Sequence, residues 1–218
     1  MKERGKRTLL IGLSLLVLFA LWTVLILTVD VRTAGETGKD IGFASLNGWF
    51  HGFTGVHMTA YYITDWLGLV PVFVCFLFGL LGLTQLVRRK SLMKVDPDIL
   101  LLGLYYVVVI LCYLLFEMIP INYRPIFIEG RLEASYPSST TLLVLSVMPT
   151  LVFQSERRLK HPGMKKVISV LTSLFSLFMV IERLVSGVHW LTDIVGSVFL
   201  SMGLFFIYKG VVLRIREV

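Results

Sequence analysis

The chain has 218 residues, of which 56% are hydrophobic and only 16% are charged, whereas a soluble domain carries about 25% charged residues. This composition excludes an ordinary water-soluble enzyme, and the high apolar content excludes intrinsic disorder. A net charge of +7 would suggest a nucleic-acid partner in a soluble protein, but here it reports which side of a bilayer the charges occupy. We therefore expect a lipid bilayer as partner, and no nucleic acid. Cys75 and Cys112 both lie in apolar runs, which argues against a disulfide.

Long apolar runs dominate the chain and predict an all-α, polytopic membrane protein. A run of about 20 residues spans the roughly 30 Å hydrocarbon core as a helix. The first run follows a basic N-terminus and precedes no small-residue cleavage site, so we expect an uncleaved signal-anchor helix. The aromatic-rich segment 41–62 is expected at the membrane interface. Residues 1–218 then form a single membrane domain, a bundle of six transmembrane helices at about residues 8–29, 65–87, 98–119, 138–154, 167–186 and 190–209.

The basic residues give the orientation of this bundle. Of the 21 Lys and Arg residues, 16 fall in segments on the same side as the N-terminus and only 5 on the other side. Because cytoplasmic loops are rich in Lys and Arg, this asymmetry predicts that both termini are cytoplasmic. We expect an integral protein of a cell membrane, of bacterial type.

Polar residues near membrane depth are costly and often mark function. Here they form three clusters on the predicted outer side, Glu117–Pro125, Tyr136–Thr141 and Glu182–Asp193. His189 and Asp193 are four residues apart, and on a helix they share a face. The carboxylate then fixes the tautomer of the imidazole and makes its other nitrogen a better nucleophile or base. The alternative is an interfacial pair without chemistry.

The other clusters supply groups that bind anions. Arg124 and Arg183 carry planar guanidinium groups, which suit two-point contact with phosphate. Ser138 and Ser139 open a predicted helix, whose free N–H groups attract an anion. Arg124 and the serines each have a simpler interpretation than anion binding. In that interpretation Arg124 extends to the membrane interface, and the serines only cap a helix. His51 and His57 lack a nearby carboxylate or cysteine pattern and are interpreted as loop histidines rather than metal ligands.

Together the three clusters resemble the type 2 phosphatidic acid phosphatase (PAP2) superfamily, whose signature is Lys-x6-Arg-Pro, then Pro-Ser-Gly-His, then Ser-Arg-x5-His-x3-Asp. Arg124-Pro125 matches the first motif, Pro137-Ser138 begins the second, and Arg183, His189 and Asp193 match the spacing of the third. The resemblance covers about residues 60–210 and implies a six-helix lipid phosphatase. It also implies that His189 attacks phosphorus, that Asp193 orients His189, and that Arg124 and Arg183 bind the phosphate.

The chain departs from the signature at three places. The family lysine falls on Glu117, the family Gly-His falls on Ser139-Thr140, and the family serine falls on Glu182. The resemblance therefore implies the loss of the general acid and of one cation. A positioned acid contributes about 10²- to 10⁴-fold in rate, and Thr140 or Thr141 can orient a water but cannot replace an imidazolium.

Three accounts fit these departures. In the first, the substrate has a good leaving group, as a lipid diphosphate does. In the second, Glu117 has taken the acid role. In the third, the chain binds or transports an anionic phospholipid without turnover. We favour a lipid phosphatase that acts on a lipid phosphate or diphosphate at the outer membrane face, without metal or cofactor. Transfer to an acceptor other than water stays open, as do the lipid and the oligomeric state.

Overall fold

A computed structural model describes residues 2–34 and 37–215 of the chain. It is almost entirely helical, apart from a short antiparallel ribbon in which Arg32 pairs with Ile41 and Thr33 with Asp40. The elements, in chain order, are α1 (Lys2–Thr28), β1 (Arg32–Thr33), β2 (Asp40–Ile41), α2 (Ala44–Thr54), α3 (Met58–Leu67), α4 (Leu69–Arg89), the 3₁₀ turn η1 (Leu92–Lys94), α5 (Pro97–Met118), α6 (Ser139–Arg158), α7 (Pro162–Val185) and α8 (Leu191–Ile215).

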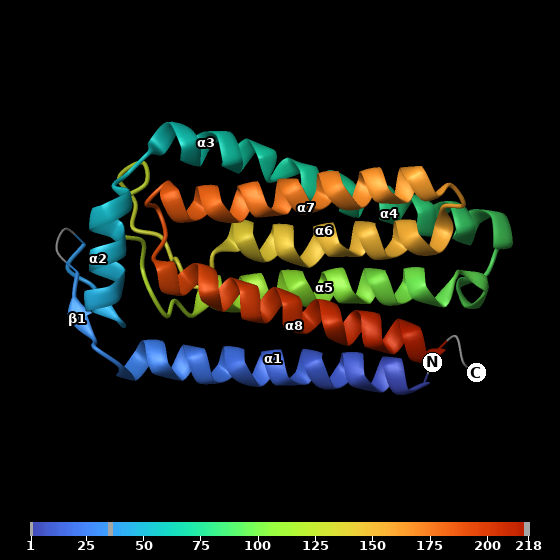
Figure 1. Cartoon of the computed structure of the whole chain (residues 1–218), viewed down its shortest axis with the longest axis horizontal. Coiled ribbons are helices and arrows are strands. Elements are labelled where there is room, and N and C mark those ends of the chain that lie inside the picture. Colours follow the sequence, from blue (N-terminus) through green and yellow to red (C-terminus); the bar gives the residue numbers. More distant parts are fainter. Residues whose placement is uncertain (1, 35–36, 216–218) are drawn as a thin grey trace.

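The long helices run side by side along the longest axis of the molecule (Figure 1). One end of the bundle holds the start of α1, the end of α8 and the α4–α5 and α6–α7 connections. The opposite end holds α2, the β ribbon, the α5–α6 loop and the α7–α8 turn, and α2 lies across the bundle there. All three polar clusters of the sequence therefore belong to this second end. Which end faces the cytoplasm stays a prediction from the basic residues.

Within the described residues, five helical stretches are long and apolar enough to cross a membrane. Each overlaps one predicted span, and the predicted span 138–154 corresponds to α6, which does not meet the same criterion. The reason is its place in the bundle, because α6 packs against α4, α5, α7 and α8 and can bury polar side chains that a lipid-facing helix could not. The five stretches are Glu3–Thr28, Met58–Arg89, Pro97–Met118, Pro162–Val185 and Leu191–Ile215.

Several helices extend beyond the predicted spans. The second span, expected at 65–87, begins at Met58, and the last, expected at 190–209, continues to Ile215. Polar and charged residues continue these helices past the apolar core, where hydropathy no longer detects them. The predicted interfacial segment 41–62 contains α2 and the start of α3. Trp49 and Phe53 on α2 are exposed, but their position relative to lipid stays a prediction.

Close contact between α1 and α8 depends on glycine. A Cβ atom on Gly12 would lie 2.8 Å from the backbone nitrogen of Ile207 and 2.9 Å from the carbonyl oxygen of Gly203. Small residues allow helix backbones to approach closely in membranes, where packing rather than the hydrophobic effect drives association. Gly196, Gly203 and Gly210 recur every seven residues along α8, and a Cβ on Gly203 or Gly210 would lie 2.7 Å from Leu16 or Leu9 of α1.

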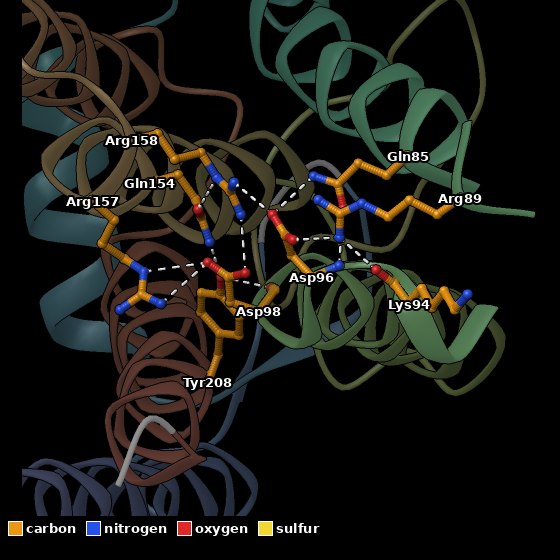
Figure 2. A network of polar contacts seen from close by, with 9 residues as sticks. All are labelled: Gln85, Arg89, Lys94, Asp96, Asp98, Gln154, Arg157, Arg158 and Tyr208. Carbon is orange, nitrogen blue, oxygen red and sulfur yellow. Dashed lines mark hydrogen bonds and ion pairs between the residues drawn. The ribbon is translucent and has the colours of Figure 1, made fainter. Parts of the chain in front are cut away.

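At the end of the bundle away from the polar clusters, ion pairs connect three helices (Figure 2). Asp96 pairs with Arg89 at 2.8 Å and with Arg158 at 3.0 Å. Asp98 pairs with Arg158 at 2.9 Å and with Arg157 at 3.2 Å. Burial raises the pKa of Asp96, but hydrogen bonds from Arg89, Arg158 and Gln85 outweigh it and lower that pKa to about 2. These contacts tie α4, α5 and α6 together.

Asp96→Asn tests this ionic cluster. Because the pKa of Asp96 is lower in the folded protein than the unfolded value of 3.8, its stabilisation is present above about pH 4 and is lost as the pH falls through about 2. We expect Asp96→Asn to lower the free energy of unfolding in detergent at pH 7 by about 1 kcal/mol or less, because the site is partly exposed. The apparent unfolding temperature should fall with it. The difference from the native chain should shrink towards pH 2, and a difference independent of pH would contradict the assignment.

Candidate functional site

The turn between α7 and α8 carries His189. Gly187 starts the turn with φ of 70°, a conformation that glycine adopts without strain. His189 is only 3% exposed. The predicted last span begins at residue 190 and α8 begins at Leu191, so His189 lies in the turn before the helix and does not share a helix face with Asp193. The turn nevertheless brings His189 Nδ1 to 3.7 Å from Asp193 Oδ2, which is longer than a hydrogen bond.

The carboxylate of Asp193 is fully buried and organises the start of α8. Its Oδ2 accepts a hydrogen bond from the backbone N–H of Trp190 at 2.9 Å. Its Oδ1 accepts one from Asn122 Nδ2 at 3.2 Å. A side chain in the first helical turn that reaches back to the preceding N–H satisfies a group the helix cannot. Asp193 therefore fixes the backbone beside His189 as well as lying next to the imidazole.

Both ring nitrogens of His189 are buried without a hydrogen-bond partner. Burial lowers the pKa of His189 to about 4. The carboxylate of Asp193 opposes this shift, while the nearby charges of Arg124 and Arg183 add to it. The imidazole is therefore neutral at physiological pH, which is the protonation state a nucleophile or base requires.

The guanidinium groups of Arg183, from α7, and Arg124, from the α5–α6 loop, both lie over the ring of Tyr61. The guanidinium carbon of Arg183 lies 4.7 Å from the ring centroid, and that of Arg124 lies 5.6 Å from it. Arg183, in the last turn of α7, is 1% exposed, and its Nη2 is 3.2 Å from Asp65 Oδ1. Cation–π contact holds these charges in place where water is excluded.

The α5–α6 loop positions Arg124 through a short hairpin. The Arg124 backbone N–H donates to the Glu133 carbonyl at 3.1 Å, and the Ser135 N–H donates to the Asn122 carbonyl at 2.9 Å. The side chains follow the same pairing, since Arg124 Nε lies 3.0 Å from Glu133 Oε2. Trp190 Nε1 donates to the Tyr123 carbonyl at 2.7 Å. This bond joins the loop to the turn that carries His189.

The start of α6 packs beside the start of α8, next to Asp193. Ser138 precedes the helix but its side chain makes no capping hydrogen bond, so the alternative of a simple side-chain cap does not describe it. Ser138 Oγ and Thr141 Oγ1 are buried without a partner. The Ser138 carbonyl accepts from Ser197 Oγ at 3.1 Å, which joins the start of α6 to α8. Ser139 is partly buried.

Two neighbouring cavities open beside these residues. A polar cavity of about 170 Å³ is lined by Glu117, Arg124 and Glu133 among others. An apolar cavity of about 300 Å³ between α4, α5 and α6 is lined by Asp65 and Thr140, among others. Tyr113 and Ser139 line both. Glu117 therefore faces the same space as Arg124, and Thr140 faces the apolar cavity.

Several buried polar atoms converge here without protein partners. They are Arg124 Nη1, Arg183 Nε, Ser138 Oγ and both ring nitrogens of His189. Buried polar groups are nearly always hydrogen-bonded, so a cluster without protein partners is a candidate site for a polar ligand or ordered water. Donors on two guanidiniums and a hydroxyl match the oxygens of a phosphate group.

The described residues contain no group of three or more His, Cys, Asp or Glu side chains that could hold a metal. His51 Nε2 lies 3.1 Å from the Gly187 carbonyl and His57 Nε2 lies 2.9 Å from the Thr54 carbonyl. Both rings therefore contact backbone oxygens.

Four residues that contact the site do not belong to any sequence motif: Tyr61, Asp65, Asn122 and Glu133. Asp65 contacts Arg183 from a helix 118 positions away in the chain. Motif spacing cannot predict such a contact. The one available signal was the position of Asp65 at the outer start of a predicted span, on the same side as Arg183.

The sequence model of the PAP2 superfamily matches residues 104–216, which is more than half of the chain. The protein therefore belongs to the PAP2 superfamily, as the resemblance of its motifs predicted. Comparison with curated proteins found no match. Among solved structures, the fold is similar to the transmembrane PAP2-type phosphatidylglycerolphosphate phosphatase from Bacillus subtilis, with a TM-score of 0.65 and 20% sequence identity over 94% of this chain and 96% of that one.

The titration of His189 provides a test of the site that needs no substrate. The chain has four histidines, so ¹⁵N-labelled histidine gives few signals, and His189→Ala identifies the relevant one. Because burial dominates, we expect His189 to become charged only near pH 4, well below the ordinary value of about 6.5. A titration near 6.5 would show that the imidazole is solvated and would contradict the geometry described above.

Proposed function

We propose that the protein is a lipid phosphatase that hydrolyses a lipid phosphate or diphosphate at the outer membrane face, through a phosphohistidine on His189 and without metal. Membership of the PAP2 superfamily and the shared fold of a membrane phosphatase support the general class. The observation that carries the proposal is the convergence of partnerless buried groups on His189, Arg124, Arg183 and Ser138.

The proposed reaction has two displacements at phosphorus. Neutral His189 attacks through Nε2, the nitrogen farther from Asp193, and the bond from phosphorus to the leaving oxygen breaks. The Asp193 carboxylate, 3.7 Å from Nδ1, stabilises the positive charge that develops on the ring. Water then attacks the phosphohistidine, phosphate departs, and the ring returns to its neutral form.

Arg124 and Arg183 neutralise the charge that accumulates on the phosphate oxygens, which is the main contribution a protein makes to phosphoryl transfer. Thr140 stands where the family has the histidine that protonates the leaving alkoxide. A diphosphate releases a phosphate monoester, which needs less protonation, so this departure favours a lipid diphosphate. Glu117 shares the polar cavity with Arg124 but is exposed, so the burial that would keep a carboxylic acid protonated for an acid role is not provided at this position.

The decisive measurement is phosphate release by purified protein in the presence of a chelator. The substrate panel comprises an isoprenoid diphosphate, phosphatidic acid and phosphatidylglycerolphosphate. We expect His189→Ala to lower kcat by at least about 10³-fold. His161→Ala is the matched control, because His161 lies at the other end of the bundle and should leave kcat unchanged. Equal release by native protein and His189→Ala would refute the proposed nucleophile.

A second candidate function is binding or transport of an anionic phospholipid without turnover. The observation in its favour is that Glu117, in place of a cation, faces the same cavity as Arg124, while Thr140 cannot act as a general acid. This function predicts saturable binding of the same lipids and no phosphate release.

The double substitution Glu117→Lys with Thr140→His separates the two candidates. If the native chain only binds lipid, these changes restore the family lysine and histidine and should create phosphate release where none existed. If the native chain is an enzyme, it already releases phosphate, and the double variant changes the rate or the preferred lipid. Turnover by the native chain, abolished by His189→Ala, would exclude the second candidate.

A further inference from the structure

Helix α2 covers the turn that carries His189, from outside the bundle (Figure 1). Its outward face exposes Leu46, Trp49 and Phe53. Its inward face carries Asn47 and His51, four residues apart and therefore on the same side of the helix. Asn47 is completely buried. Such a residue must form hydrogen bonds to offset the cost of its burial.

The side chain of Asn47 forms hydrogen bonds with Thr192 in the first turn of α8. Its Oδ1 accepts a hydrogen bond from the backbone N–H of Thr192 at 3.3 Å. Its Nδ2 donates to Thr192 Oγ1 at 3.0 Å and to the Gly42 carbonyl at 2.8 Å. The first N–H groups of a helix have no partner within it. Asn47 thus caps α8 from a different helix, next to the cap that Asp193 provides to Trp190.

Other contacts hold the opposite side of the same turn. His51 Nε2 lies 3.1 Å from the Gly187 carbonyl, and the His57 backbone N–H donates to the Ser186 carbonyl at 2.9 Å. The chain after α2 also lies tightly against the turn, because a Cβ on Gly187 would be 1.9 Å from the Gly55 carbonyl oxygen. His189 is therefore held between two contact points with the α2 region, one before it and one after it.

We propose that Asn47 is a positioning residue for the nucleophile: by capping α8 from outside the bundle, it holds the turn that aims His189 at the substrate phosphorus. The inference rests on the proposed function. Asn47 does not contact the reacting atoms, so it acts only through the backbone around His189. Removing it should misplace the imidazole, and small displacements of a reacting group cost large factors in rate.

Kinetics on the lipid that the native chain hydrolyses tests this role. We expect Asn47→Ala to lower kcat at least about 10-fold while KM changes by less than about 3-fold, because the phosphate-binding arginines are untouched. The matched control is Gln154→Ala at the other end of the bundle. Gln154 is also buried, and its Nε2 donates to Tyr208 at 2.7 Å while its Oε1 accepts from Arg158 at 2.8 Å. The control should lose comparable stability but keep kcat.

The conservative variant Asn47→Gln separates positioning from general packing. Its amide keeps both the acceptor for the Thr192 N–H and the donor for the Gly42 carbonyl, whereas a carboxylate would place an unpaired charge against that carbonyl at a completely buried position. We expect Asn47→Gln to retain kcat within a few-fold of the native value. The proposal is overturned if Asn47→Ala has the same kcat as Gln154→Ala, or if Asn47→Gln loses as much rate as Asn47→Ala.

A readout without turnover distinguishes this proposal from the proposed function. In ¹⁵N-histidine spectra, Asn47→Ala should shift the His189 signal and move its titration towards the ordinary value, whereas Gln154→Ala should leave both unchanged. If the native chain hydrolyses none of the lipids, the proposed function fails while these spectra still decide whether Asn47 holds His189. An unchanged His189 signal in Asn47→Ala would overturn the positioning role in either case.

Discussion

The buried carboxylate of Asp193 is the contact on which the end of the bundle that holds His189 depends. It accepts hydrogen bonds from Trp190 and Asn122, while the Asp193 backbone carbonyl accepts from Ser197 at 2.8 Å. These bonds join the α5–α6 loop, the α7–α8 turn and the first turn of α8. A buried charge in a membrane protein is tolerated only when it is satisfied in this way. The position of His189 follows from that requirement, because the imidazole lies in the turn that Asp193 fixes.

The electrostatics of the site are set by two buried guanidiniums, each paired with a more exposed carboxylate. Arg183 is 1% exposed and its partner Asp65 is 60% exposed, whereas Arg124 is 8% exposed and its partner Glu133 is 39% exposed. A carboxylate near water can turn away at little cost, whereas the arginines have no such route because burial and the Tyr61 ring hold them. Under the proposed function, the buried arginines would stay in place while the exposed carboxylates give way to the oxygens of a phosphate.

The two ends of the bundle differ in whether their polar side chains have hydrogen-bond partners. At the end that holds Asp96 and Asp98, the carboxylates are paired with arginines and glutamine (Figure 2). At the other end, the buried nitrogens of His189 and the hydroxyl of Ser138 have no partner. Unsatisfied buried groups cost stability, and a protein keeps them only where a ligand will use them. The satisfied end holds the helices together, and the unsatisfied end is where chemistry is expected.

The sequence by itself determined the helical membrane architecture and the family, because apolar runs and short motifs are local properties that survive without tertiary context. It also brought together Arg124, Arg183 and His189, since their motifs fall on one side of the predicted bundle. It could not determine the 3.7 Å separation of His189 from the Asp193 carboxylate, because His189 lies in a turn whose geometry depends on which groups cap α8. Nor could it determine that Asn47, Asp65, Asn122 and Glu133 hold the site residues. Those contacts join segments far apart in the chain, and only the packing of the helices decides which distant polar side chain satisfies each buried group.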